Sequence, residues 1–318
     1  MEKAIKLISY NIDGLPETLD LNDLPWILKP IAWIYKLIKG TTIVTINDGG
    51  HKQESITNIS KKLSKSDADI IAVQEDFNYH DELMSSLSNY KCGTYSGGFD
   101  LSHLFSSTEW YTYFPLPRFK ADGINIIAKD KISFSDEKIV RWKKSYGYFT
   151  HANDLLTHKG FRLYKVTIDE NAIVDLYILH MDADFYNPDK CPDVSKDVDA
   201  RKKQLEQLTK HIIEKREGKN PVIIIGDTNS SVKYEWDIEN IENNLLKPIN
   251  EVENLNIKEI IPEDFKDVDR VFFINDKNSD MKIKDGKCYY DKNYTWEYGR
   301  LSDHYPLMVE LTIENKKN

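Results

Sequence analysis

The sequence predicts an α/β protein with a mixed sheet or two stacked sheets. Short apolar runs typical of buried strands alternate with segments whose apolar residues recur at helical spacing. Four of these runs end directly in polar residues, which are Asn11, Glu75, His180 and the segment Asp227-Thr228-Asn229. No linker-like composition, repeat or low-complexity tract interrupts the 318 residues. We therefore expect a single domain over residues 1–318.

The first predicted strand leads up to Asn11 and is followed by an amphipathic insertion at 21–50. On a helix over Leu24–Ile38, one face carries Trp26, Pro30, Trp33 and Leu37, and the other carries Lys29, Ala32, Lys36 and Lys39. This pattern is typical of a segment that lies in a membrane interface with basic residues toward the headgroups. Tertiary packing uses the same periodicity, so an insertion packed against its own domain is the alternative.

The rest of the chain continues the alternation of helices and strands. Ile56, Ile59 and Leu63 predict one helix, and Val198, Leu205, Leu208 and Ile212 predict a second that ends near Gly218. Strands are predicted at 70–75, 123–128, 161–168, 173–180, 221–225, 267–274 and 307–313. The strands at 161–168 and 173–180 are predicted to pair through a hairpin turn at 169–171. Residues 92–119 predict a long surface excursion, and 235–262 predict loops and short helices.

Composition limits the classes of partner. The net charge is −9 and the sequence pI is near 5.5, so no global basic field attracts nucleic acid or anionic lipid, although local basic patches stay open. Cys92, Cys191 and Cys288 have no paired spacing and no CxxC motif, so the sequence indicates neither a zinc cluster nor a dense disulfide framework and favours a reducing compartment. One disulfide plus a free thiol stays open.

The N-terminal residues lack the basic and apolar regions of a signal peptide, and no apolar run reaches the length of a membrane span. We therefore expect a cytoplasmic protein, with export or a membrane-peripheral location left open.

Six motifs in chain order resemble the endonuclease/exonuclease/phosphatase superfamily, from about residue 5 to 312. They are Ser9-Tyr10-Asn11, Val73-Gln74-Glu75, His180, Gly226-Asp227-Thr228-Asn229, Asp269-Arg270-Val271 and Ser302-Asp303-His304. The superfamily includes deoxyribonuclease-like enzymes, apurinic endonucleases, inositol polyphosphate 5-phosphatases and neutral sphingomyelinases. The resemblance implies a four-layer α/β/β/α sandwich of two packed mixed sheets flanked by helices.

Cleavage of a phosphate ester needs a cation, a base for water and donors for the charge of the transition state. Oxygen ligands without cysteine favour Mg²⁺, with Mn²⁺ as the alternative. Glu75 is the best candidate ligand, and Asn11 would bind the metal or fix the Glu75 carboxylate. Each also has a structural interpretation, as a solvated acid at a strand end and as a cap of a strand-to-loop turn.

The resemblance also implies catalytic roles. His304 contacts the scissile phosphate and moves protons, oriented by Asp269, while Asp303 supports the metal. Asp227 orients or deprotonates the attacking water, and the phosphate receives hydrogen bonds from Asn229 and His180. A lone histidine at a strand end is more often structural, so the assignment of His180 depends on the ordered set of partners.

A narrower likeness points to one branch of the superfamily. Asp154-Leu155-Leu156-Thr157-His158-Lys159-Gly160-Phe161 and the segment Ala200–Leu205 resemble neutral sphingomyelinases. In that branch Lys159 contacts the substrate phosphate and Asp154 pairs with it. The alternative is a turn before a strand with a solvated aspartate. Val73–His80 also resembles a sub-branch of microbial proteins in this superfamily.

The sequence therefore predicts a monomeric Mg²⁺-dependent phosphoesterase that hydrolyses by direct in-line attack of water, without a covalent intermediate. The predicted substrate is a phospholipid, sphingomyelin or a relative, cleaved at the headgroup phosphodiester. A nuclease would instead show a basic rim from residues such as Lys143, Lys144 and Arg118. An inositol polyphosphate phosphatase would gather several cations in a deep pocket. An inactive binding module would usually lack Glu75, Asp227 or His304, and all three are present.

Overall fold

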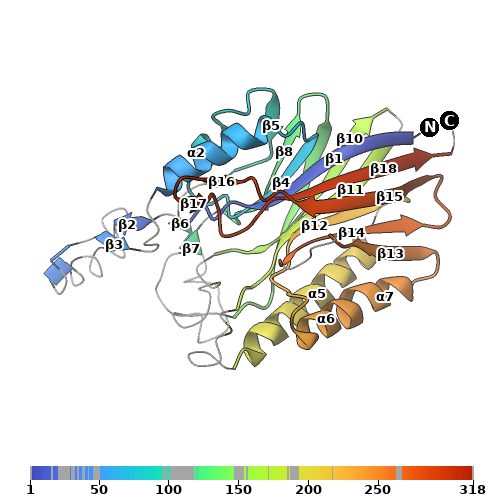
Figure 1. The fold of residues 1–318 in the computed structure, drawn as a ribbon. Helices are drawn as coiled ribbons and strands as arrows, with labels where there is room; N and C mark the ends of the chain where they lie inside the picture. Colours follow the sequence, from blue (N-terminus) through green and yellow to red (C-terminus); the bar gives the residue numbers. More distant parts are fainter. Residues whose placement is uncertain are drawn as a thin grey trace.

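The computed structural model shows two six-stranded sheets packed face to face, with helices on both outer faces (Figure 1). The predicted α/β class and the four-layer order are therefore confirmed. The described residues are 2–15, 17–20, 29, 33, 36–37, 40–41, 43–45, 51–95, 99–100, 118–119, 121–146, 154, 157–170, 172–184, 186, 193–216, 218–262 and 267–316.

The first sheet has the order β15-β18-β1-β4-β8-β5. Its strands are β1 (Glu2–Asn11), β4 (Ile70–Gln74), β5 (Tyr90–Cys92), β8 (Asn125–Lys129), β15 (Met281–Tyr290) and β18 (Leu307–Asn315). β1 runs parallel to β4 and antiparallel to β18. Helix α2 (Lys52–Leu63) buries Ile56, Ile59 and Leu63 on the outer face, as their spacing predicts, and α3 (His80–Met84) lies beside it.

The second sheet has the order β13-β14-β12-β11-β10-β9. Its strands are β9 (Ser133–Arg141), β10 (Gly160–Asp169), β11 (Ala172–His180), β12 (Val222–Asp227), β13 (Leu255–Ile260) and β14 (Asp269–Asp276). The predicted hairpin is β10–β11, and β11 runs parallel to β12. Its outer face is covered by α5 (Ser195–Lys215), α6 (Glu235–Ile241), the π-helical turn η5 (Glu242–Leu246) and α7 (Lys247–Asn250).

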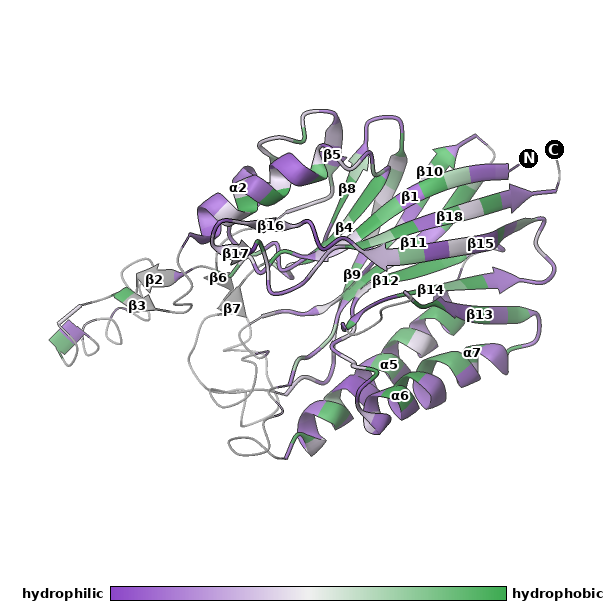
Figure 2. Ribbon diagram, in the orientation of Figure 1, coloured by the Kyte–Doolittle hydropathy of each residue, from purple (hydrophilic) through white to green (hydrophobic). Residues whose placement is uncertain are grey.

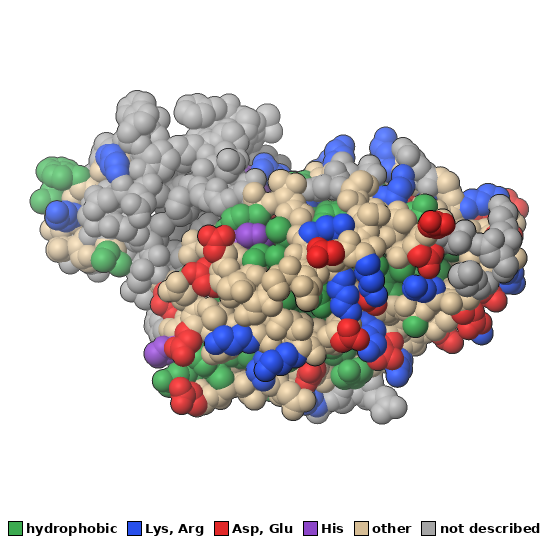
Figure 3. All heavy atoms as spheres, turned by 90° about the horizontal axis from the view of Figure 1, so that it is seen from above, with side chains coloured by type: hydrophobic (Ala, Val, Ile, Leu, Met, Phe, Trp, Pro, Cys, Tyr) green, Lys and Arg blue, Asp and Glu red, His purple; other side chains and the backbone are tan. Residues whose placement is uncertain are grey.

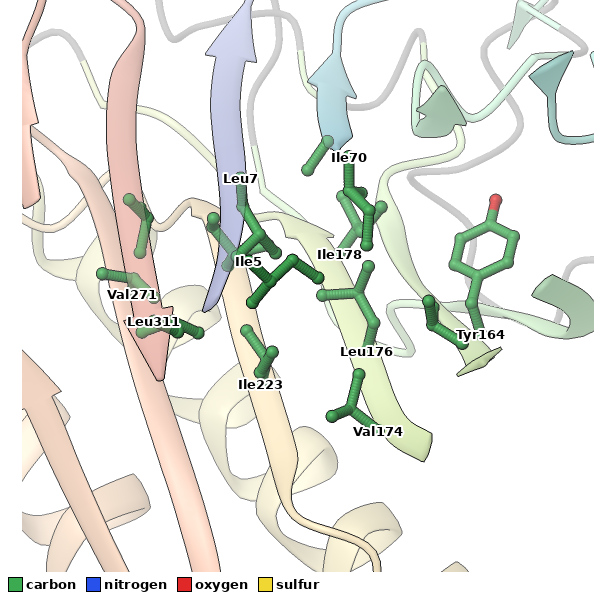
Figure 4. Close-up of a cluster of buried hydrophobic side chains, with 14 of the residues drawn as sticks. Ile5, Leu7, Ile70, Tyr164, Val174, Leu176, Ile178, Ile223, Val271 and Leu311 are labelled. Carbon is green, nitrogen blue, oxygen red and sulfur yellow. The ribbon is translucent and has the colours of Figure 1, made fainter. Parts of the chain in front are cut away.

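The main core lies between the sheets, where branched aliphatic side chains from both inner faces interdigitate (Figure 4). Ile5 and Leu7 of β1 meet Leu176, Ile178 and Ile223 of β11 and β12. Two further clusters join each sheet to its helices. Hydrophobic residues accordingly alternate with polar ones along most strands (Figure 2), and the packing holds the strand ends of both sheets at one edge.

Three two-stranded ribbons complete the described structure. They are β2 (Thr18–Asp20) with β3 (Ile43–Thr45), β6 (Phe99–Asp100) with β7 (Arg118–Phe119), and β16 (Thr295–Trp296) with β17 (Gly299–Arg300). The β2–β3 ribbon is the base of an arm that projects beyond the end of β1 (Figure 1). Among the described residues, no helix is long and apolar enough to cross a bilayer.

Parts of two predicted segments lie outside the described residues. Of the predicted interfacial segment 24–38, only Lys29, Trp33, Lys36 and Leu37 are described, and all four are helical and exposed. Most of the predicted surface excursion at 92–119 lies outside the described residues, as does Cys191.

Four strands of the two large sheets were not predicted, and the reason is physical. β5, β9, β13 and β15 are the edge strands, where one neighbour is missing and polar side chains can face solvent. Such strands contain no long apolar run. The prediction of loops and short helices at 235–262 was therefore wrong for β13, whereas α6, η5 and α7 form a continuous helical stretch there.

Candidate functional site

Strand pairing places three of the predicted residues in one row. His180 lies opposite Asp227 where β11 and β12 run parallel, and Asp227 lies opposite Asp269 where β12 and β14 run antiparallel. In the other sheet, Asn11 ends β1 opposite Gln74 of β4, so Glu75 lies one residue beyond that pair. Because both sheets end at the same edge, the two sets of polar side chains meet.

Asp227 is the residue that joins the two sets. Its Oδ2 atom accepts a hydrogen bond of 3.0 Å from Asn11 Nδ2, which comes from the other sheet. The same oxygen lies 3.5 Å from His180 Nε2 and 3.7 Å from His304 Nε2, and Oδ1 accepts from the backbone N–H of Asn229 at 2.8 Å. A buried carboxylate surrounded by two imidazoles can accept a proton from a bound water.

His304 is fixed by a short hydrogen bond to Asp269, with 2.6 Å between Nδ1 and Oδ2. Burial lowers the pKa of His304, but the Asp269 and Asp227 carboxylates outweigh it and hold that pKa well above its usual range. Ser302 completes the support, since its hydroxyl accepts from the His304 backbone N–H at 3.1 Å and donates to the Asn11 carbonyl at 2.7 Å. His304 is therefore an oriented imidazolium whose Nε2 faces the site.

Glu75 has a constrained backbone at the end of β4. Its φ of 61° lies in the left-handed region, and a Cβ on Gly14 would lie 2.2 Å from the Glu75 carbonyl oxygen, so only glycine permits this approach. Asn11 Nδ2 donates to Glu75 Oε1 at 3.1 Å, which matches the predicted role of fixing the carboxylate.

The acidic groups at this end of the site fit a divalent cation. Burial raises the pKa of Glu75 to about 7, with further increases from Asp13 and Asp303, while Lys159 and the Asn11 hydrogen bond lower it. Burial and Asp303 also raise the pKa of Asp13, against the opposing effect of Lys52. Mutually repelling oxygen donors of this kind are the ligands that Mg²⁺ prefers.

A second acidic group is less suited to a cation. Asp267, Asp269 and His304 have ligand atoms that all lie within 4.8 Å of one another. However, His304 Nδ1 and Asp269 Oδ2 already bond to each other, and the charged imidazole repels a cation. We therefore favour Glu75, with the predicted Asp303, as the metal end of the site. The Asp303 side chain is 65% exposed and lies 4.0 Å from His304 Nε2.

His180 is fully buried, and neither ring nitrogen has a hydrogen-bond partner in the described part of the chain. Burial, Lys159 and His304 lower its pKa well below the usual value, so the ring is neutral. A buried N–H without a partner is costly, and a phosphate oxygen would satisfy it. Asn229 is less free than predicted, because its Nδ2 already donates to the Met181 carbonyl at 2.9 Å.

Lys159 and Asp154 lie inside the site and not on a solvated turn. Lys159 Nζ is 2.5 Å from Asp154 Oδ1, and both side chains are buried. Asp154 Oδ2 also accepts from the Ala183 backbone N–H at 2.9 Å. Asp154 and Glu75 keep Lys159 charged, since they raise its pKa against the effect of burial. The alternative of a solvated aspartate at position 154 is therefore wrong.

Two acidic residues near the predicted site residues, Asp13 and Asp182, were not predicted. Asp13 follows Asn11 by two residues, and an acid so close to a ligand candidate at a strand end is the signal that could have identified it. Asp182 is fully buried after β11, accepts from the Tyr146 backbone N–H at 2.7 Å and contributes to the raised pKa of Lys159. Asp182 also follows a predicted site residue, His180, by two positions, but its role depends on its burial next to Lys159.

The model of the "Endonuclease/Exonuclease/phosphatase family" matches residues 8–273. The chain belongs to the endonuclease/exonuclease/phosphatase family. Its match contains Asn11, Glu75, His180, Asp227 and Asp269, and His304 lies beyond it. As a member of this family, the protein is a metal-dependent phosphoester hydrolase. A search of curated protein sequences found no match.

Solved structures of three proteins share the fold of this endonuclease/exonuclease/phosphatase protein over nearly its whole length. Sphingomyelinase C from Streptomyces griseocarneus is 13% identical with a TM-score of 0.60, covering 97% of this chain and 99% of that one. Beta toxin 275-280 from Staphylococcus aureus is 16% identical with a TM-score of 0.59, covering 96% and 99%. A mutant of the same beta toxin with bound magnesium ions is also 16% identical, with a TM-score of 0.54 over 99% of this chain and 100% of that one. Truncated Caenorhabditis elegans TDP2 is 11% identical with a TM-score of 0.57, covering 97% of both chains.

Proposed function

We propose that this protein uses Mg²⁺ to hydrolyse the headgroup phosphodiester of a phospholipid, sphingomyelin or a relative. The observation that carries the proposal is the arm beside the site. Trp33 and Leu37 on this arm are 64% and 65% exposed, and Lys29 and Lys36 are exposed with them. Figure 3 shows hydrophobic and basic side chains together at the tip. Large exposed apolar groups next to lysines are suited to a lipid surface.

The catalytic steps follow from the geometry of the buried side chains. Asp227 Oδ2 is placed to take the proton of the attacking water, since it faces the space between His180 and His304. His304, kept charged by Asp269, donates toward the phosphate through Nε2. Neutral His180 and charged Lys159 offer further donors for the developing negative charge. A bound Mg²⁺ at Glu75 would neutralise the phosphate and polarise its oxygens.

The substrate class can be tested by a direct comparison. Purified protein is assayed on sphingomyelin vesicles, single- and double-stranded DNA and phosphoinositides, each with Mg²⁺ and with EDTA. We expect Mg²⁺-dependent release of the phosphorylated headgroup from vesicles, lost in Glu75→Gln and His304→Gln. Preferred cleavage of DNA or of phosphoinositides would replace the lipid proposal by one of those activities. Of the predicted nuclease rim, Lys143 is exposed and Lys144 is half-buried, and the Arg118 side chain lies outside the described residues.

A second experiment tests the arm. Trp33→Ser with Leu37→Ser removes apolar area worth a few kcal/mol of membrane binding, so vesicle activity should fall at least tenfold. Hydrolysis of a soluble phosphodiester should not change. Ile238→Ser is the matched control, because Ile238 is 48% exposed on α6, away from the arm. Equal vesicle activity of the arm variant and the control would refute membrane contact. We further propose that the protein acts as a single-domain monomer, which sedimentation tests.

A further inference from the structure

A second group of reactive side chains lies outside the phosphoesterase site, on the outer side of the first sheet. Cys92 at the end of β5 has its Sγ 3.6 Å from Nε2 of His80, the first residue of α3. The other ring nitrogen of His80, Nδ1, is 2.7 Å from Asp76 Oδ2. A thiol, an imidazole and a carboxylate therefore lie in line, an order in which the carboxylate keeps the imidazole charged and the imidazolium stabilises a thiolate.

The surroundings hold the imidazole in place. The His80 ring stacks on Tyr95 with a centroid distance of 4.2 Å and an interplanar angle of 7°, and the Tyr95 hydroxyl donates to the Phe77 carbonyl at 2.7 Å. Asp76 is 1% exposed, and its Oδ2 also accepts from Asn125 Nδ2 at 3.3 Å. Its Oδ1 is buried without a hydrogen-bond partner among the described residues. Such a carboxylate gains from a charged imidazole beside it.

We propose that Cys92 is a reactive thiol, activated by His80 and Asp76, that is modified by small disulfide compounds. The Cys92 thiol gives its proton to water, the adjacent charged His80 ring stabilises the thiolate, and the thiolate then attacks one sulfur of the disulfide. A new S–S bond forms at Cys92, the old S–S bond breaks, and one thiolate leaves and takes up a proton. The disulfide is the only oxidant required. Nothing in this proposal depends on the substrate of the hydrolase site.

Two opposing effects act on the pKa of the Cys92 thiol. Burial and the Asp76 charge raise the pKa of Cys92. Asp76 and Asp81 raise the pKa of His80 against the effect of burial, so the ring adjacent to the sulfur is charged. The imidazolium is the nearer group, with direct contact to Sγ, whereas Asp76 contacts the far side of the ring. Direct contact with a cation is the arrangement that lowers thiol pKa values in proteins.

The chain contains its own reference thiol. Cys288 is also half-buried, but its Sγ donates to the Ile260 carbonyl at 3.3 Å and burial raises its pKa to about 12. Both cysteines are half-buried, and among the described residues an imidazole contacts Cys92 but none is recorded at Cys288. A difference in their reactivity therefore reports the effect of His80.

The experiment measures the rate of modification of the full chain by dipyridyl disulfide as a function of pH, with the modified cysteine identified by peptide mass mapping. An imidazolium beside a thiol increases the thiolate fraction at pH 6 more than it decreases the intrinsic nucleophilicity of the sulfur. We therefore expect Cys92 to react about tenfold faster at pH 6 in the wild type than in His80→Gln. The order should reverse above about pH 9, where both thiols are ionised and the thiolate beside the imidazolium is the weaker nucleophile.

Cys92→Ser should remove the fast reaction that mass mapping assigns to Cys92 and leave the reactions of Cys191 and Cys288 unchanged. If His80→Gln fails to fold, the wild-type profile decides the question, with Cys288 as the reference. Reaction of Cys92 at pH 6 no faster than that of Cys288, or a rate that rises only along the profile of an ordinary thiol, would overturn the proposal.

Discussion

The buried pair of Lys159 and Asp154 allows stability and catalysis to be separated in one experiment. The two charges are 2.5 Å apart, and their side chains are 7% and 0% exposed. We consider Asp154→Asn, Lys159→Met and the double variant. Each single change leaves one buried charge without its counterion, while the double change removes both charges together.

The expected loss of unfolding free energy follows from the burial of the Lys159–Asp154 ion pair. Breaking a buried ion pair by removing one partner costs about 3–5 kcal/mol of unfolding free energy. For a chain of 318 residues the unfolding entropy is about 0.7 kcal/mol/K, so each single variant should unfold about 5–7 °C below the wild type. The double variant should regain most of this loss, because no uncompensated charge remains. Calorimetry of all four proteins completes the cycle.

Activity should follow a different pattern from stability. If Lys159 donates to the phosphate in the transition state, its removal lowers kcat by about 100-fold or more, in the double variant as in the single one. Steady-state kinetics on a soluble phosphodiester measures this without the membrane step. A double variant with wild-type stability and wild-type kcat would show that the pair is structural. Single variants that melt with the wild type would refute the burial argument itself.

Three further outcomes test the site. Asp269→Asn removes the largest interaction that raises the pKa of His304, so the limb of the pH–activity profile due to His304 should move at least one unit toward lower pH. If this limb of the pH–activity profile does not move, the pKa that it reports belongs to a group other than His304. Glu75, with a pKa of about 7 in the absence of a cation, must ionise to bind one. Mg²⁺ affinity from calorimetry should therefore fall about tenfold from pH 8 to pH 6 and level off above pH 8, and a flat profile would exclude Glu75 as a ligand. Gly14→Ala would press a Cβ against the Glu75 carbonyl, so Mg²⁺ affinity should fall about tenfold with unchanged circular dichroism.

The strands and site residues that could be predicted from the sequence are those with a signal in their own local sequence. The central strands β4, β11 and β12 are apolar on both faces, so each appears as a continuous run that ends at a polar residue. The edge strands β9 and β15 carry charged side chains toward solvent, and their place in the sheet depends on neighbours far along the chain. The catalytic candidates were found because they lie at strand ends. Asp182 was missed because its importance comes from burial next to Lys159, which only the folded chain reveals.

The union of the two sheets at one site depends on a contact that no local pattern predicts. Asn11 and Asp227 are 216 residues apart, yet their side chains hydrogen-bond across the core. Gly226 makes the row on the second sheet possible, since its φ is 143° and a Cβ there would lie 2.1 Å from the Leu179 carbonyl oxygen. With any larger residue, β12 would move away from β11 and Asp227 would leave its position opposite His180. The sandwich core and the catalytic row therefore constrain each other, because a shift of one sheet over the other breaks the Asn11–Asp227 bond and separates Glu75 from His180.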